Sequence, residues 1–139
     1  MNQVYESQHP LVQHKITVLR QADTNVRRFQ ELVRELTMLL AYEALADLAL
    51  VEASVTTPLD EAEGHLLTER VALVPILRAG LGMVDPIWDL IPLAQVGHIG
   101  LYRDEDTLQP VQYYSKLPSA DQVDLCLLLD PMLATGGSA

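Results

Sequence analysis

The last seventeen residues constrain the fold more than any other part of the sequence. An apolar, β-prone run over residues 123–129 stops at an acid, Asp130, and a Thr-Gly-Gly-Ser segment follows at residues 135–138. A strand with apolar residues on both faces is typical of a parallel sheet that helices cover on both sides. Ligands of such sheets bind at the carboxyl ends of the strands. The sequence therefore predicts an α/β fold with a binding site just after Asp130.

The residue types in this closing turn indicate a phosphate ligand. Gly136 and Gly137 let backbone N–H groups approach an anion without a Cβ in the way. Thr135 and Ser138 add hydroxyl donors, and a helix that begins at Ser138 would direct its N-terminus at the same anion. Residues 134–138 are therefore predicted to form a phosphate cradle.

The charge balance limits how the chain can hold an anion. Nineteen acidic residues against nine basic ones give the 139-residue chain a net charge of −10, so we expect no binding to nucleic acid or to acidic membranes. No apolar run approaches the roughly 20 residues that a membrane span needs. Because salt screens charges beyond about 8 Å, groups close to the ligand decide its binding. Arg78 and Arg103, which end two predicted strands, are the candidate cations.

The rest of the pattern predicts alternating helices and strands. Strands are expected over residues 70–77 and 95–102, and a β-like stretch over residues 48–57 leads into an acidic hairpin turn at residues 60–69. A short helix with Pro10 in its first turn, a long helix from an N-cap at Thr24 to about Asp47, and a helix near residues 83–90 that packs Trp88 into the core complete the elements. Crossover connections would make the strands parallel and bring Arg78, Arg103 and Asp130 to one edge of the sheet.

The glycines after residues 70–77 admit two interpretations. Gly80 and Gly82 follow a strand and precede a helix, as in a dinucleotide-binding turn, but Asp85 stands where the third glycine of that fingerprint belongs. The pattern therefore favours a loop that binds a diphosphate through Arg78 and the turn amides.

Three segments resemble the uracil phosphoribosyltransferase family of type I phosphoribosyltransferases. Residues 130–138 resemble its signature for phosphoribosyl pyrophosphate (PRPP), in the form that carries Pro131 where most type I relatives have a second acid. Residues 74–83 are similar to its pyrophosphate loop, and residues 102–110 to the segment that opens its flexible catalytic loop. The resemblance implies the type I fold, a mostly parallel sheet flanked by helices with a β-hairpin arm used in dimer contacts.

The implied reaction joins uracil to PRPP and yields UMP and diphosphate, with Mg²⁺ bound mainly through PRPP and by no direct protein ligand. The resemblance assigns catalysis to Arg103 and Asp130. It assigns PRPP binding to Arg78, Ala79, Gly80, Arg103, Asp130, Pro131, Met132, Leu133, Ala134, Thr135, Gly136, Gly137 and Ser138. Residues 1–139 are then expected to form a single phosphoribosyltransferase domain that is C-terminally truncated, ending inside the PRPP loop without the part that reads uracil.

Two functional hypotheses follow for the chain. The intact Arg78, Arg103 and Asp130 favour an enzyme of pyrimidine salvage, whereas the missing uracil-reading part favours a catalytically incompetent PRPP-site module or regulatory subunit with weak or no turnover. A related RNA-binding attenuator is disfavoured because the chain has no basic stripe. The resemblance also implies a homodimer or higher homo-oligomer and, in some members, GTP as an effector. Cys126, the single cysteine, predicts a reducing, cytoplasmic location.

Overall fold

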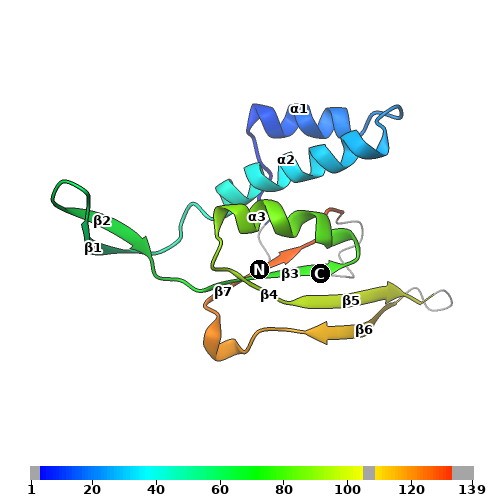
Figure 1. Cartoon of the computed structure of the whole chain (residues 1–139). Helices are drawn as coiled ribbons and strands as arrows, with labels where there is room; N and C mark the ends of the chain where they lie inside the picture. The colour runs from blue at the N-terminus through cyan, green and yellow to red at the C-terminus, as the bar shows by residue number, and fades with distance from the viewer. Residues whose placement is uncertain (1–3, 105–108, 133–139) are drawn as a thin grey trace.

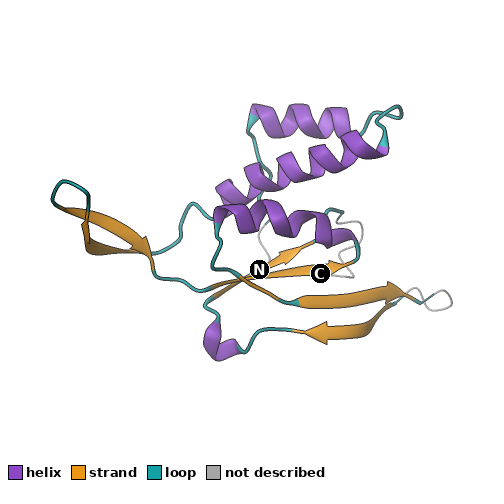
Figure 2. Cartoon of the chain, viewed as in Figure 1, coloured by secondary structure: helices purple, strands orange, loops and turns teal. Residues whose placement is uncertain are grey.

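A computed structural model describes residues 4–104 and 109–132 of the chain. Three helices stack on one side of a sheet, and a separate two-stranded arm projects from the body (Figures 1 and 2). The elements are α1 (Pro10–Leu19), α2 (Val26–Ala44), β1 (Leu50–Thr56), β2 (Glu61–Leu67), β3 (Val71–Leu77), the 3₁₀ helix η1 (Ala79–Met83), α3 (Val84–Leu90), β4 (Gln95–Val96), β5 (His98–Arg103), β6 (Pro110–Lys116), the 3₁₀ helix η2 (Ala120–Gln122) and β7 (Leu125–Leu129). Within the described part of the chain, no helix has the length and hydropathy to cross a membrane.

Strand β3 is the centre of the sheet. β7 pairs with it in parallel from Val71↔Leu125 to Pro75↔Leu129. β4 and then β5 follow its other edge, also in parallel, and β6 returns antiparallel to β5. The predicted α/β class with a mostly parallel sheet, helices and a hairpin arm is confirmed.

The core lies between this sheet and helix α3. Leu73 of β3 and Leu129 of β7 are buried against Val84 and Ile87 of α3, with Ala41 of α2 behind them. Complete burial of a side chain such as Leu73 contributes roughly 1.5–3 kcal/mol relative to exposure. This apolar contact fixes α3, and with it the turn η1 that leads into α3, on top of the strands.

The predicted helices exist, but the expected cap of the long one is wrong. Asn25 caps α2, its side-chain oxygen accepting a hydrogen bond from the Arg28 backbone N–H at 2.9 Å. The hydroxyl of Thr24 instead donates to the carbonyl oxygen of Val18, at 2.6 Å. Asn is a stronger N-cap residue than Thr, so the order of capping preferences favours the cap that the structure shows. Helix α2 also ends at Ala44, before the predicted Asp47.

Two strand predictions are corrected. Residues 60–69, expected to form a turn, contain the strand β2, whose acidic residues Glu61 and Glu63 are exposed in a regular ladder with β1. Residues 95–102 are two strands, because at Gly97 the chain leaves the ladder, although the Gly97 N–H still donates to the Leu73 carbonyl at 2.9 Å.

Strand β7 is covered on one face only in the described part of the chain. Leu129 is buried and Leu125 and Leu127 are half-buried, whereas Cys126 and Leu128 are exposed. One apolar face of β7 is therefore open to solvent in the described part of the chain.

An ion pair joins β3 and β7 at the edge away from their carboxyl ends. The Arg70 guanidinium donates to both carboxylate oxygens of Asp124, at 2.9 Å each, and the Arg70 backbone N–H donates to one of them. These hydrogen bonds hold the pKa of Asp124 well below its usual range. A carboxylate whose pKa is lower in the folded state stabilises the fold above its unfolded pKa, about 3.9.

This pair predicts an acid-dependent loss of stability. We expect the stabilisation from Asp124 to be complete above about pH 4 and to disappear as the pH falls further toward the folded-state pKa. Thermal unfolding should therefore show Asp124→Asn below wild type at pH 7, with a gap that narrows as the pH falls from 4 to 2.5, whereas the control Asp47→Asn should track wild type throughout. A constant gap for Asp124→Asn at every pH would contradict this role of the pair.

Candidate functional site

The carboxyl ends of β7, β3 and β5 lie side by side at one edge of the sheet. Asp130 comes directly after the Pro75↔Leu129 pair, and Arg78 directly after the last residue of β3. Arg103 lies three residues beyond the Leu77↔Gly100 pair, at the end of β5. Since the three strands run parallel, their carboxyl ends face the same edge of the sheet, and β5 continues three residues beyond its last pair with β3.

Arg78 and Ala79 are presented on the outside of the turn after β3. Both residues are exposed, and the Leu77–Arg78 peptide bond is cis. The Arg78 carbonyl accepts a hydrogen bond from the Leu81 N–H at 3.2 Å, which starts η1. Within residues 4–104 and 109–132, no carboxylate forms an ion pair with Arg78, so its charge can meet an anionic ligand.

Gly80 allows the turn after β3 to pack directly against the end of β7. It is buried, and a Cβ at this position would overlap the carbonyl oxygen of Leu129 and lie 3.1 Å from the Cα of Pro75. Only glycine therefore lets η1 rest directly on the peptide that precedes Asp130. By contrast, a Cβ at Gly82 would meet nothing within 4 Å. The sequence predicted a tight turn at Gly80 but not the strand against which it packs.

Asp130 is held by its own turn. It is half-buried, and its Oδ1 accepts a hydrogen bond from the Met132 backbone N–H at 3.2 Å. This local bond orients the carboxylate at the strand end, while Pro131 and Met132 are exposed. The remaining predicted phosphate-binding residues lie outside the described residues: Leu133, Ala134, Thr135, Gly136, Gly137 and Ser138.

The donor set at this edge suits a divalent cation that arrives with a phosphorylated ligand. Among the described residues, no three His, Cys, Asp or Glu side chains are grouped so that they could hold a metal ion. Mg²⁺ in proteins commonly takes one or two carboxylates and completes its shell with water and substrate phosphates. Asp130 could supply one such oxygen, directly or through water, and a diphosphate the others.

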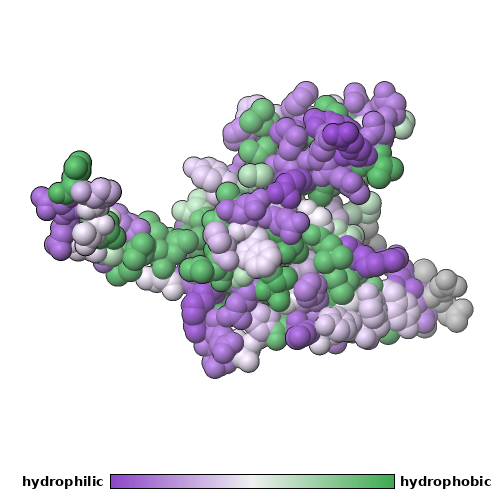
Figure 3. Space-filling model, viewed as in Figure 1, coloured by the Kyte–Doolittle hydropathy of each residue, from purple (hydrophilic) through white to green (hydrophobic). Residues whose placement is uncertain are grey.

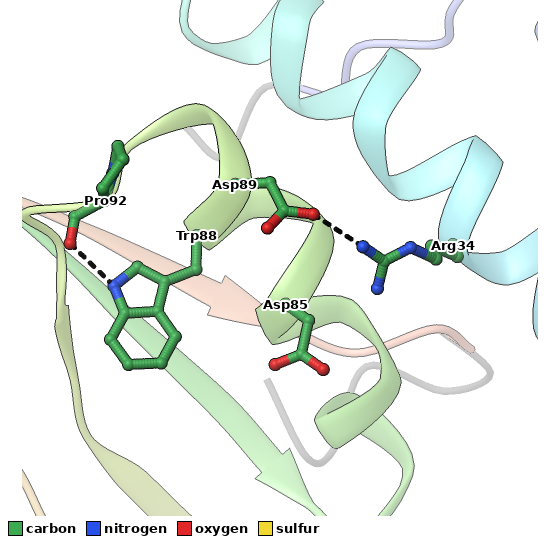
Figure 4. Close-up of a pocket in the computed structure, with 5 residues that line it drawn as sticks. All are labelled: Arg34, Asp85, Trp88, Asp89 and Pro92. Carbon is green, nitrogen blue, oxygen red and sulfur yellow. Dashed lines mark hydrogen bonds and ion pairs between the residues drawn. The ribbon is translucent and has the colours of Figure 1, made fainter.

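A shallow hollow elsewhere on the molecule contains none of the predicted site residues. It lies between α2 and α3 and is lined by Arg34, Asp85, Trp88, Asp89 and Pro92 (Figure 4). Arg34 pairs with Asp89 at 2.6 Å, and the Trp88 indole N–H donates to the Pro92 carbonyl at 3.0 Å. Trp88 is 45% exposed, so its predicted place in the core is wrong. Because the hollow lies apart from the strand ends that carry the predicted site residues, we assign it no role.

Comparison with known proteins identifies relatives over the whole chain. The family model for uracil phosphoribosyltransferase matches residues 6–139. The uracil phosphoribosyltransferases of Roseiflexus sp. (strain RS-1) and Clostridium botulinum (strain Eklund 17B / Type B) are 67% and 51% identical; each alignment covers all of this chain and 67% of the relative. The solved AQ2163 protein from Aquifex aeolicus superposes with a TM-score of 0.88 at 40% identity, over 96% of this chain and 64% of that one. The chain thus spans about two thirds of the length of these relatives.

Proposed function

The chain belongs to the uracil phosphoribosyltransferase family, transferases of pyrimidine salvage, and we propose that it binds PRPP where β3, β5 and β7 end. There it would transfer the phosphoribosyl group to uracil, giving UMP and diphosphate. The observation that carries this proposal is that Arg78, Arg103 and Asp130 lie at the carboxyl ends of three adjacent parallel strands. The two guanidinium groups match the negative diphosphate of PRPP, and the carboxylate matches the ribose hydroxyls beside it.

The two arginines act on the leaving diphosphate. As the bond from ribose C1 to the diphosphate breaks, negative charge grows on the diphosphate and positive charge on the sugar. Arg78 and the N–H groups of Ala79 and Gly80 would donate to the diphosphate oxygens from β3, and Arg103 from β5. A preorganised donor at a developing charge contributes roughly 3–4 kcal/mol to transition-state stabilisation.

Asp130 acts on the sugar. Its carboxylate would accept hydrogen bonds from the ribose hydroxyls, and its negative charge would lie near the developing sugar cation. Residues 134–138 would anchor the 5′-phosphate, so that binding energy remote from C1 orients C1 for attack by uracil. No side chain of the chain needs to form a covalent bond with the substrate.

Mg²⁺ would be held mainly through PRPP, with the carboxylate of Asp130 nearby. When bound, it supplies positive charge that neutralises the diphosphate. The carboxylate of Asp130 at the strand end supports this mode of binding.

Conversion of labelled uracil to UMP tests the proposal. The purified chain should be assayed beside the same chain joined to the remaining third of the Roseiflexus relative, with PRPP and Mg²⁺. UMP formation by either form supports the transferase, and formation by the joined form alone also supports an incomplete 1–139 domain. If neither form makes UMP but both bind PRPP, the alternative of a catalytically incompetent PRPP-site module holds. No UMP and no PRPP binding in either form would contradict the proposal.

A homodimer through the arm is the proposed assembly. The pairs Val51↔Leu66, Ala53↔Gly64 and Val55↔Ala62 form one apolar face of the β1–β2 ribbon. Val51, Leu66 and Val55 are 47%, 53% and 40% exposed, and hydrophobic residues are visible where the projecting arm joins the body (Figure 3). An isolated two-stranded hairpin is marginally stable in water, so this face needs cover, and a second copy of the chain could supply it symmetrically.

The dimer predicts a face-specific effect of charge on the arm. Leu66→Asp should weaken self-association by about tenfold or more, because it buries a carboxylate in the apolar contact. His65→Asp introduces the same side chain one residue away on the polar face and should leave association near wild type. Light scattering across a dilution series measures both, and a monomeric wild type or equal effects of the two variants would contradict the assembly.

Two further proposals have narrower support. GTP as an effector is supported by the family resemblance; Arg27 and Arg28 are not assigned to it, because both are in ion pairs with Glu31.

A reducing, cytoplasmic location is supported by Cys126 being the single cysteine of the chain.

A further inference from the structure

We infer that Tyr113 is a positioning residue for Arg103. The Tyr113 ring packs against Gly100 and so fixes the direction in which the end of β5 leaves the sheet. This role rests on the proposed function, in which Arg103 donates to the diphosphate. The contact between the Tyr113 ring and Gly100 is observed in the β5–β6 pair and does not depend on that function.

The end of β5 depends on β6 for its position. The Leu77↔Gly100 pair is the last one between β3 and β5. Beyond it, β5 pairs with β6 alone in the described part of the chain, through Leu101↔Gln112, Tyr102↔Val111 and Arg103↔Pro110. The position of Arg103 therefore depends on the angle at which β6 leaves the rest of the sheet at Gly100.

A β-bulge lies at this junction. Gly100 pairs with Tyr114 but Leu101 pairs with Gln112, so Tyr113 is an extra residue on β6. Bulges bend and twist the strand that contains them and can re-aim nearby side chains. Loss of the bulge would allow a one-residue slip, which changes the side-chain pairing along the rest of the hairpin.

The Tyr113 ring holds the bulge in place. A Cβ at Gly100 would lie 2.5 Å from the ring Cζ and within 2.9 Å of both Cε atoms, so the ring occupies the space above the glycine backbone. The Tyr102 ring flanks it, with centroids 6.3 Å apart and an angle of 42° between the planes. This separation lies in the range of favourable aromatic pairs. Gly100 is buried as a result, although Tyr113 is 56% exposed.

Tyr113 acts on Arg103 through the backbone. Gly100 and Tyr102 share one face of β5 by strand alternation, and Arg103 lies on the other. The ring is therefore on the face away from Arg103 and does not touch a ligand that Arg103 holds. Because the ring makes the contact while much of the side chain is open to solvent, phenylalanine should replace tyrosine without loss.

Amide hydrogen exchange of the purified full chain tests the contact without reference to activity. In Tyr113→Ala, the Asp104 N–H, which donates to the Gln109 carbonyl at 3.0 Å, should exchange at least about tenfold faster. Tyr113→Phe and the neighbouring control Tyr114→Ala should stay within about twofold of wild type. Unchanged exchange in Tyr113→Ala, or equal acceleration in Tyr114→Ala, would overturn the inference.

Calorimetry with PRPP and Mg²⁺ tests the consequence for Arg103. Tyr113→Ala should weaken PRPP binding about tenfold, because the guanidinium of Arg103 is displaced, and should weaken it no further in an Arg103→Ala background. Additive losses would mean that Tyr113 does not act through Arg103, and would overturn the inference. If Arg103→Ala itself binds PRPP like wild type, or wild type binds no PRPP, the proposed function fails, and the exchange result alone decides whether Tyr113 holds the strand end.

Gly100→Ala supplies the reciprocal perturbation. Its methyl group should displace the ring and accelerate exchange of the Asp104 N–H when Tyr113 is present, but have little effect when Tyr113 is already alanine. An equal effect of Gly100→Ala in both backgrounds would show that the ring contact is not what fixes the bulge, and would overturn the inference.

Discussion

Replacement of Gly80 by alanine is expected to weaken PRPP binding by ~10²-fold and to destabilise the protein by about 1–3 kcal/mol. The added methyl group would overlap the Leu129 carbonyl oxygen and crowd the Cα of Pro75, and both are backbone atoms that cannot rotate away. The turn η1 must then lift from β7. This movement separates Arg78 from Asp130, the two groups that are proposed to hold opposite sides of the ligand.

Gly82→Ala is the matched control for this prediction. It makes the same substitution in the same 3₁₀ helix, where the added methyl group meets nothing within 4 Å. We expect its PRPP affinity to stay within about twofold of wild type, and its stability to rise slightly because alanine restricts the unfolded chain. Calorimetry and thermal unfolding of both variants provide the comparison. Equal behaviour of the two variants would show that close packing at Gly80 does not position the site.

Asp130→Asn and Arg103→Ala should each lower the rate of UMP formation by ~10²–10³-fold. Asparagine keeps the shape of Asp130 and an oxygen that can accept the hydrogen bond from the Met132 N–H, so the turn should persist while the charge is lost. Arg103→Ala removes the donor that reaches the diphosphate from β5. The first variant therefore isolates the charge near the sugar, and the second isolates a donor at the leaving group.

Both variants are best measured in the chain joined to the remaining third of the Roseiflexus relative, as kcat/KM for PRPP at saturating uracil. Asp85→Asn and Arg20→Ala, which change exposed residues with no assigned role, serve as controls for the same two chemical changes. A wild-type rate for Asp130→Asn or for Arg103→Ala would remove that residue from the mechanism. Loss of activity in the controls would point to a general effect of surface charge instead.

The parts of the site that sequence reasoning located are those that depend on strand ends. Apolar runs identify β3, β5 and β7, each run stops at a polar residue, and the rule for parallel strands brings Arg78, Arg103 and Asp130 to one edge. Strand β2 was not predicted from the sequence, because its exposed acidic residues alternate with small residues, and this pattern resembles a polar turn. Local pattern therefore located the strands that end at the site, but not β2 of the arm or the break between β4 and β5.

Contacts between residues distant in the sequence could not be predicted. Gly80 was recognised as a turn residue, yet nothing in the spacing identifies Leu129 as the strand residue that excludes a side chain there. Gly100 carried a usable signal, because glycine inside a strand often marks a bulge or a close approach. The sequence does not reveal that the Tyr113 ring fills that space. The predictions for residues 133–138 fall outside the described residues and stay predictions.

A crystal structure of the chain with PRPP and Mg²⁺ would test the central claim most directly. We predict the diphosphate within hydrogen-bonding distance, about 2.7–3.2 Å, of the guanidinium groups of Arg78 and Arg103, with the ribose hydroxyls facing Asp130. PRPP bound away from the ends of β3, β5 and β7, or held there with both guanidinium groups turned from the diphosphate, would contradict the claim.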